Sequence, residues 1–309
     1  MNFNHKTVLL SETVSALEIK KDGIYVDGTA GGGGLSLKIA SELSENGKLI
    51  CIDRDPDAIE VCKERLSKFN NVNVVHGNFS DVLDIVHNLD IHKIDGIVLD
   101  LGVSSYQLDE AERGFSYNQD AYLDMRMSKE GKSAYDVVNF MSYDELKSII
   151  KNYGEERFAS NIAKMIVKER EKKLIGTTKE LAEIVKKSVP SKVKRDSGHP
   201  ARKTFQAIRI YVNKELENLE TGLEGACELL GSGGIMAIIT FHSLEDRIVK
   251  QKMKSWEKGC TCPSDFPVCV CGNSPKVKIL TRKPILPSNE EIEYNFRSRS
   301  AKMRVCRKI

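Results

Sequence analysis

The chain has 309 residues, with 47 Lys and Arg against 44 Asp and Glu and a formal net charge of +3. This length allows two domains or one catalytic domain with a large insertion, and the small charge excess neither requires nor excludes a nucleic acid partner. No stretch approaches the run of about 20 apolar residues that crosses a bilayer, and residues 1–10 lack the apolar core of a signal peptide. We therefore expect a cytoplasmic protein without membrane contacts.

The first third of the chain alternates short β-branched runs with helical patterns, which is typical of parallel βαβ units. The predicted strands lie at residues 24–27, 48–52, 72–75 and 95–100. A glycine-rich loop at residues 28–34 joins the first strand to a helical pattern at 36–43. After the second strand, Asp55 and Pro56 suit the N-cap and the first position of a helix.

Helical signals replace the strand pattern from about residue 113 to about residue 212. Two capping boxes lie in this stretch, Ser142 with Glu145 and Thr177 with Glu180. This part of the chain is expected to be an inserted helical domain that binds substrate.

The strand pattern resumes at residues 234–240, followed by a predicted helix at 245–256 and late strands at 276–280 and 301–306. We therefore expect an α/β, Rossmann-like domain. Its N-terminal part is residues 1–112, its C-terminal part is residues 213–309, and the helical domain at 113–212 interrupts it.

The glycine-rich loop limits the choice of cofactor. Glycines between a strand and a helix let the backbone approach a ligand closely. The dinucleotide fingerprint fails, because a start at Gly31 puts Ser36 in the third glycine position and a start at Gly28 puts Ala30 in the second. A triphosphate-binding loop would need a lysine before Ser or Thr, which this loop lacks. A cofactor without a phosphate group remains.

Two aspartates end the first two predicted strands, Asp27 and Asp53. In the methyltransferase version of this fold, an acidic residue ends the first strand. The carboxylate that ends the second accepts charge-assisted hydrogen bonds from the ribose hydroxyls of S-adenosylmethionine. The alternative is that Asp53 only caps the next helix, a common place for Asp. The joint pattern of both aspartates and the glycine loop favours the methyltransferase interpretation.

Phe79 and Asp100 follow the third and fourth strands. This fold holds adenine after the third strand, and an aromatic ring offers it an apolar face, although an aromatic at such a position is also typical of a core. Asp100 stands where amino-methylating enzymes carry Asp or Asn followed by two prolines. This position faces the transferred methyl group.

Seven motifs in order resemble the bacterial 16S ribosomal RNA cytosine-N4-methyltransferases, also called the small subunit methyltransferase H family, which have the class I S-adenosylmethionine-dependent fold. The motifs are residues 5–10 (HKTVLL), 53–56 (DRDP), 100–105 (DLGVSS), 112–116 (ERGFS), 153–158 (YGEERF), 204–209 (TFQAIR) and 241–247 (FHSLEDR). The resemblance spans nearly the whole chain.

The resemblance implies N4-methylation of a cytidine in the decoding region, at the P site, of 16S rRNA, with naked rRNA or the assembled small subunit as substrate. The resemblance is also compatible with a homodimer. The implied cofactor contacts are Gly33, Gly34, Leu35, Asp53, Phe79, Asp100 and Gln107. The family usually has His where this chain has Leu35, so only a backbone contact is carried over at that position.

The exocyclic amine of cytosine is a poor nucleophile, because its lone pair is delocalised into the ring. A group that accepts the N4 hydrogens would favour a more reactive nitrogen and take the proton. Asp100 is the expected catalytic acceptor, with orientation of the cofactor as the alternative role. His242 is a second candidate, for which a structural role after a buried strand is the alternative.

Basic residues gather in a loop before residue 204 and again near the C-terminus. The first group is Lys192, Lys194, Arg195, His199, Arg202 and Lys203, and the second is Arg297, Arg299, Lys302, Arg304 and Arg307. Both groups suit phosphate contacts, and both are equally typical of a solvated surface.

Two Cys-x-Cys pairs lie close together, Cys260 with Cys262 and Cys269 with Cys271. Four such thiolates would hold a structural zinc ion and leave no open position for catalysis. The more common zinc spacing is Cys-x-x-Cys, so redox-active or simply reduced thiols are the alternative.

Two other functions stay open. The first is an NAD-dependent oxidoreductase, which the failed glycine fingerprint disfavours. The second is a non-catalytic RNA-binding protein that uses the basic loop and the cysteine segment as a zinc module. Such a protein would bind RNA without affinity for S-adenosylmethionine.

Overall fold

The computed structural model describes residues 7–190, 199–262, 268 and 270–309. They belong to two compact units, one formed by Met1–Gly102 with Leu216–Ile309 and the other by Val103–Glu215. Within the described residues, every helix is too short or too polar to span a bilayer.

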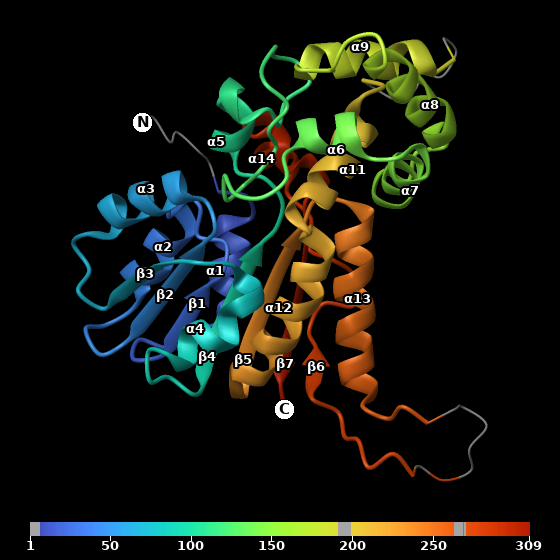
Figure 1. Cartoon of the computed structure of the whole chain (residues 1–309). Helices are drawn as coiled ribbons and strands as arrows, with labels where there is room; N and C mark the ends of the chain where they lie inside the picture. Colours follow the sequence, from blue (N-terminus) through green and yellow to red (C-terminus); the bar gives the residue numbers. More distant parts are fainter. Residues whose placement is uncertain (1–6, 191–198, 263–267, 269) are drawn as a thin grey trace. The chain divides into compact units, whose positions relative to one another are not determined.

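The first unit is built on a seven-stranded sheet with the strand order β3-β2-β1-β4-β5-β7-β6 (Figure 1). The strands are β1 (Ile24–Asp27), β2 (Lys48–Asp53), β3 (Val72–His76), β4 (Ile94–Asp100), β5 (Leu230–Thr240), β6 (Val277–Ile279) and β7 (Lys302–Lys308). Strands β1 to β5 are parallel to their neighbours in that group, whereas β7 runs antiparallel to both β5 and β6. The predicted α/β, Rossmann-like fold is confirmed.

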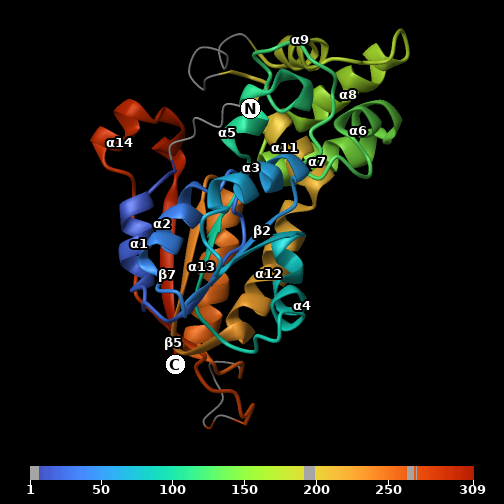
Figure 2. The same ribbon diagram turned by 90° about the vertical axis from the view of Figure 1, so that its left-hand side faces the viewer.

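Helices cover both faces of this sheet. They are α1 (Leu10–Leu17), α2 (Gly34–Glu42), α3 (Pro56–Leu66), α4 (Val82–His87), α12 (Glu215–Leu229) and α13 (Ser243–Lys258). The unit also contains the short helix α14 (Asn289–Tyr294) and the 3-10 turns η1 (Phe79–Asp81) and η3 (Phe296–Ser300). The buried residues of α1, α2 and α3 form one core cluster, and those of α4, α12 and α13 form another. Figure 2 shows α1 and α2 on one side of the sheet and α4 and α12 on the other.

The strand side chains alternate between these two clusters. On β5, Ile235, Ala237 and Ile239 join the cluster under α1 to α3, while Met236 and Ile238 join the other. This period of two is the pleat of a strand buried on both faces, and it explains why the central strands are apolar almost throughout. Both faces are therefore closed, and the strand ends are the part of the sheet left for a ligand.

The second unit is helical. Its elements are α5 (Ser105–Asp109), η2 (Ala111–Arg113), α6 (Ala134–Phe140), α7 (Tyr143–Gly154), α8 (Ala159–Arg170), α9 (Thr178–Ser188) and α11 (Arg202–Asn213), and their apolar faces form a third core cluster. This unit begins at Val103, earlier than the boundary at residue 113 that the sequence suggests. The reason is that Val103 and Leu108 pack against the helical core.

The helix ends follow local sequence rules. Asp55 caps α3 by accepting a hydrogen bond from the amide of Asp57, and Pro56 is the first helical residue, as predicted. The predicted capping boxes of Ser142 and Thr177 are both present, at the starts of α7 and α9. Strand β5 begins at Leu230, ahead of the predicted residue 234, because α12 runs directly into it.

Candidate functional site

The C-terminal ends of β1, β2 and β4 meet at one edge of the sheet, and each strand ends in an aspartate. Asp27 pairs in register with Cys51 on β2 and with Val98 on β4, so Asp53 and Asp100 each lie two residues further along the sheet edge. The end of β1 is thus recessed between two longer neighbours. This is the switch point of a doubly wound sheet, where such folds bind their ligands.

The glycine-rich loop crosses this recess. The Gly28 amide bonds to the Val98 carbonyl at 3.0 Å and the Ala30 amide to the Ile52 carbonyl at 2.9 Å, so the loop is fastened to both neighbouring strands. Gly33 has a φ of 76° and precedes the first residue of α2, and a Cβ on Gly34 would lie 2.5 Å from the Thr7 hydroxyl oxygen. A side chain is therefore disfavoured at Gly33 by the backbone conformation and excluded at Gly34 by the contact with Thr7. The first amides of α2 are left without intrahelical partners at this edge.

The Asp27 carboxylate anchors the glycine-rich loop through hydrogen bonds. It is 1% exposed, and its carboxylate accepts the Ser36 hydroxyl at 2.6 Å and the Thr29 amide at 3.2 Å. Burial raises the pKa of Asp27 to about 6, although those two hydrogen bonds act in the opposite direction. Because both oxygens bond within the loop, Asp27 orders the recess and does not line its surface.

Asp53 is held by two main-chain amides. Gly31 donates to its Oδ2 at 2.7 Å and Asp55 to its Oδ1 at 2.8 Å. The cap of α3 is Asp55, so Asp53 does not serve as the cap of that helix. Each carboxylate oxygen has a second lone pair, so this orientation leaves acceptor capacity for a ribose diol. Burial raises the pKa of Asp53 above its ordinary value.

Phe79 stands next to the glycine loop. A Cβ built on Gly28 would lie 3.3 Å from the Phe79 Cβ, and one built on Gly222 would lie 2.5 Å from its ring. The ring therefore packs on the backbone of α12, where only glycine fits. Phe79 is partly buried against the core cluster under α4 and α12. It therefore makes the core contact that the sequence offered as the alternative to an adenine contact, and it does so beside the glycine loop.

Asp100 carries an unusual carboxyl group. Its backbone amide donates to the Thr29 hydroxyl at 2.6 Å. Its Oδ1 atom is buried and has no hydrogen-bond partner among the residues that the structure describes. A buried polar atom without a partner is costly, and such atoms concentrate where a ligand supplies the partner. Burial raises the pKa of Asp100 to about 8, and the negative charges of Asp27, Glu245 and Glu291 act in the same direction.

Glu245 and Glu291 are site residues that the sequence did not single out. Glu291 on α14 is 5% exposed and accepts the Leu9 amide at 3.0 Å, across 282 positions of the chain. Glu245 is 2% exposed and accepts the amides of Phe241 and His242 at 2.9 and 3.2 Å. The signal that was available for Glu245 was its place in the motif at residues 241–247.

His242 caps α13. Its ring accepts the Glu245 amide at 3.4 Å, and its Nε2 lies 3.1 Å from the Glu245 carboxylate. The capping box explains why His and Glu stand three residues apart in this motif. His242 therefore has a structural role as the cap of α13. Its Nε2 is buried and makes no hydrogen bond to the residues that the structure describes, so the catalytic role stays a prediction.

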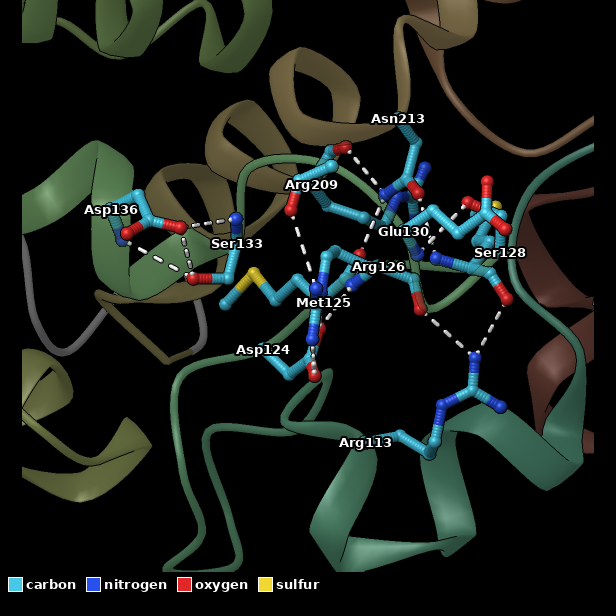
Figure 3. A network of polar contacts seen from close by, with 12 residues as sticks. Arg113, Asp124, Met125, Arg126, Ser128, Glu130, Ser133, Asp136, Arg209 and Asn213 are labelled. Carbon is cyan, nitrogen blue, oxygen red and sulfur yellow. Dashed lines mark hydrogen bonds and ion pairs between the residues drawn. The ribbon is translucent and has the colours of Figure 1, made fainter.

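In the helical unit, polar side chains organise the loop before α6 (Figure 3). The buried Arg113 guanidinium donates to the carbonyls of Arg126 and Met127, each at 2.9 Å. Asn213 accepts the Met127 amide at 2.8 Å and donates to the Met125 carbonyl at 2.7 Å. The Arg113 of the motif at residues 112–116 therefore fixes the path of this loop.

Gln107 lies in the helical unit. It is 4% exposed, and its side-chain oxygen accepts the Ser104 amide at 3.1 Å as part of a capping box on α5. Lys192, Lys194 and Arg195 of the basic loop lie outside the described residues. Of the others, His199 stacks on Tyr117 with 4.4 Å between ring centres, and Lys203 donates to the Glu155 carbonyl at 3.0 Å.

The sequence model of the MraW methylase family matches residues 2–309. The chain belongs to this family. Two relatives, both named ribosomal RNA small subunit methyltransferase H and both from Clostridium botulinum (strains Kyoto / Type A2 and Loch Maree / Type A3), are 58% identical to it over 100% of each chain. Among solved structures, an rRNA methylase from Streptococcus thermophilus aligns with 98% of this chain and 98% of its own, at 11% identity and a TM-score of 0.43.

Leu35 occupies the position at which the family resemblance implies a His. The Leu35 side chain is 4% exposed and belongs to the core cluster under α1 to α3. It is in the first turn of α2, directly after the loop glycines. The position can therefore offer its backbone amide to a ligand, while its side chain serves the core.

The basic C-terminal residues of this MraW-family chain are largely paired within its sheet unit. Arg304 is 7% exposed and bonds to both oxygens of Asp246, at 2.6 and 3.2 Å, which ties β7 to α13. Arg307 is paired with Glu18. Arg299 stands over the Phe296 ring at 5.1 Å. Ion pairing within the fold therefore accounts for Arg304 and Arg307, which we do not assign to phosphate contacts.

Proposed function

We propose that this protein transfers a methyl group from S-adenosylmethionine to N4 of a cytidine at the P site, in the decoding region of 16S rRNA. Family membership over the whole length, with relatives named as small subunit rRNA methyltransferases, supports the reaction class and the substrate. The observation that carries the proposal within the site is the Oδ1 atom of Asp100, at the end of β4 beside the recess, which is buried and has no hydrogen-bond partner among the residues that the structure describes. A ribosomal substrate places the activity in the cytoplasm.

The recess suits the cofactor in three respects. Gly33 and Gly34 leave no side chain over the loop, so the backbone amides of Gly34 and Leu35 are open to the carboxylate of the amino-acid part. Asp53 is oriented by two amides to accept the ribose hydroxyls. Phe79 flanks the position of the adenine. We include Gln107 in this set on the family resemblance.

The chemistry requires a proton acceptor next to the amine. When bound, S-adenosylmethionine supplies a methyl group on a cationic sulfur, whose charge favours the ionised form of a neighbouring carboxylate. Asp100 Oδ1 accepts a hydrogen bond from the N4 amine and keeps the nitrogen lone pair directed at the methyl carbon. As the N–C bond forms, the bond between the methyl carbon and sulfur breaks and the N4 proton passes to Asp100, so that S-adenosylhomocysteine is the leaving group. Burial, together with the charges of Asp27, Glu245 and Glu291, raises the pKa of Asp100 and makes that carboxylate a stronger base than an ordinary aspartate.

The cytosine must leave its base stack to reach this edge, as enzymes that modify a base generally require. We propose that the helical unit, residues 103–215, binds the surrounding RNA. Its exposed Arg202 and the stacked pair of Tyr117 and His199 are of the residue types that contact phosphates and bases.

Transfer of tritium from labelled S-adenosylmethionine tests the function. We expect label in 16S rRNA, supplied either naked or in small subunits from cells that lack this protein, and recovery of the label as N4-methylcytidine after digestion. Label on another base or atom contradicts the N4 assignment. RNA binding without cofactor affinity in calorimetry would instead support the non-catalytic alternative, and a nicotinamide-dependent absorbance change would support the oxidoreductase.

A further inference from the structure

We propose that the loop between α13 and β6 binds one structural zinc ion through the thiolates of Cys260, Cys262 and Cys271. The sulfur atoms of these three residues all lie within 4.8 Å of one another. This loop belongs to the sheet unit, and no part of the methyl-transfer site uses it.

The spacing of the sulfur atoms matches a tetrahedral metal. Zinc binds thiolate sulfur at about 2.3 Å, so two sulfurs at corners of a tetrahedron around zinc stand about 3.8 Å apart. Cys260 Sγ and Cys271 Sγ are 3.9 Å apart. This separation is far longer than the disulfide bond of about 2.05 Å, so these two sulfurs are not bonded to each other. Sulfur-only ligand sets in tetrahedral geometry favour zinc over the harder divalent cations.

Main-chain amides also point at the sulfurs. Thr261 donates to Cys271 Sγ at 3.4 Å, and Val270 donates to Cys262 Sγ at 3.3 Å. Such bonds favour the charged thiolate over the thiol and fix the ligand orientation, as the outer partners of metal ligands do. Cys269, the remaining thiol of this segment, lies outside the described residues and is the sequence candidate for the fourth corner.

The place of this loop in the fold indicates a stabilising role for such a metal. The base of the loop is closed, because the Lys276 amide bonds to the Trp256 carbonyl at 2.8 Å and a Cβ on Gly259 would lie 2.3 Å from the Ser274 carbonyl carbon. Beyond this base, two apolar residues of the described part of the loop, Val268 and Val270, are 70% and 74% exposed and do not contribute to a core. Small segments without a core are commonly held by metal, and here zinc would clamp the connection between α13 and β6.

Metal analysis of the purified full-length protein tests the proposal. We expect about one zinc ion per chain after gel filtration in zinc-supplemented buffer, and a large loss of zinc in the Cys260→Ser and Cys271→Ser variants. Cys227→Ser, which removes a buried thiol on α12, serves as the matched control and should keep its zinc. Wild-type zinc content in either loop variant, or a wild-type content below about 0.1 per chain, overturns the proposal.

Two further measurements keep the test independent of how well the variants fold. Titration of the wild-type protein with a mercurial reagent should release the zinc, detected with a coloured chelator, as the loop thiols react. After removal of zinc and denaturation without reductant, all 8 cysteines should titrate as free thiols. Two fewer thiols would reveal a disulfide and refute the metal site.

Discussion

The Asp100 amide bonds to the Thr29 hydroxyl at 2.6 Å, which ties the end of β4 to the loop after β1. This bond fixes the backbone of Asp100 while its Oδ1 is left without a partner among the described residues. The backbone of Asp100 is thereby anchored beside the recess, and one carboxyl oxygen remains able to accept a hydrogen bond from a ligand. Its reactivity then depends on what else the recess contains.

Replacing Asp53 by Ala should weaken S-adenosylmethionine binding by about 10- to 100-fold, because charge-assisted hydrogen bonds to the ribose are lost. Isothermal calorimetry measures this change. Asp57→Ala, on the first turn of α3, is the matched control and should bind normally. Unchanged affinity in Asp53→Ala would remove this residue from the cofactor site.

The Asp100→Asn variant separates the two roles considered for this residue. As the proton acceptor, Asp100 should contribute roughly 100-fold or more to kcat, with little change in cofactor Kd. If it only orients the cofactor, the Kd should rise and kcat should recover at saturating cofactor. Single-turnover methylation combined with calorimetry distinguishes these outcomes. Asp95→Asn, at the opposite end of β4, is the control and should leave kcat unchanged.

The raised pKa of Asp100 makes activity and stability depend on pH in opposite directions. The ionised carboxylate is the base, so kcat/KM should rise with pH around the Asp100 pKa of about 8. For stability, the folded state binds a proton more tightly than the unfolded chain, whose Asp has the ordinary value of 3.8. The contribution of Asp100 to stability is therefore fully present below pH 3.8 and is lost as the pH rises towards about 8.

Thermal melts of the cofactor-free protein across this pH range measure the stability effect. The Asp100→Asn variant should flatten the upper part of the curve. A residual slope at lower pH is expected from Asp27, whose pKa is raised to about 6 by burial. A wild-type melting temperature that rises between pH 6 and pH 8 would contradict the assignment for Asp100. One that rises between pH 3.8 and pH 6 would contradict the assignment for Asp27.

Truncation of Leu35 should affect stability and not cofactor binding. The buried side chain fills the core, so Leu35→Ala should cost about 2–5 kcal/mol in the free energy of unfolding. Cofactor affinity should stay within about threefold, since the contact comes from the backbone amide. Leu37→Ala, which removes a partly buried side chain from the same helix, should cost less. A selective loss of affinity in Leu35→Ala would show that the side chain contacts the cofactor.

Arg113→Ala should destabilise the helical unit by roughly 2–4 kcal/mol, because two buried carbonyls lose a charged donor. Arg113→Lys should recover little of this, since a lysine lacks the planar fork that reaches both carbonyls. Denaturant unfolding is the measurement, and Lys132→Ala, an exposed change near the same loop, is the control. Equal stability of Arg113→Ala and wild type would refute the role of this network.

The sheet and its strand-end aspartates could be predicted because they depend on local patterns. Strands alternating with helices define parallel neighbours, and parallel strands place Asp27, Asp53 and Asp100 at one edge without any knowledge of tertiary contacts. The capping residues Asp55 and Ser142 were predictable for the same reason, since a cap bonds within its own helix.

Long-range contacts account for what the sequence could not supply. Glu291 reaches the site edge through Leu9, at the other end of the chain, and no local pattern signals such a contact. Arg304 belongs to a basic run in the sequence, yet its partner Asp246 lies on a helix that only the fold brings near. The boundary at Val103 has the same origin, because packing against a core decides it.

The pairing of β4 with β5 has a consequence for biosynthesis. These two strands are neighbours in the sheet, yet the entire helical unit, residues 103–215, separates them along the chain. As the protein leaves the ribosome, β4 has β1 beside it, while the main-chain groups along its other edge must wait for residues 230–240 to be synthesised. The helical unit, being continuous, can fold during this delay. The enzyme is therefore expected to complete its catalytic half last, with an unpaired strand edge that is most prone to aggregation until β5 arrives.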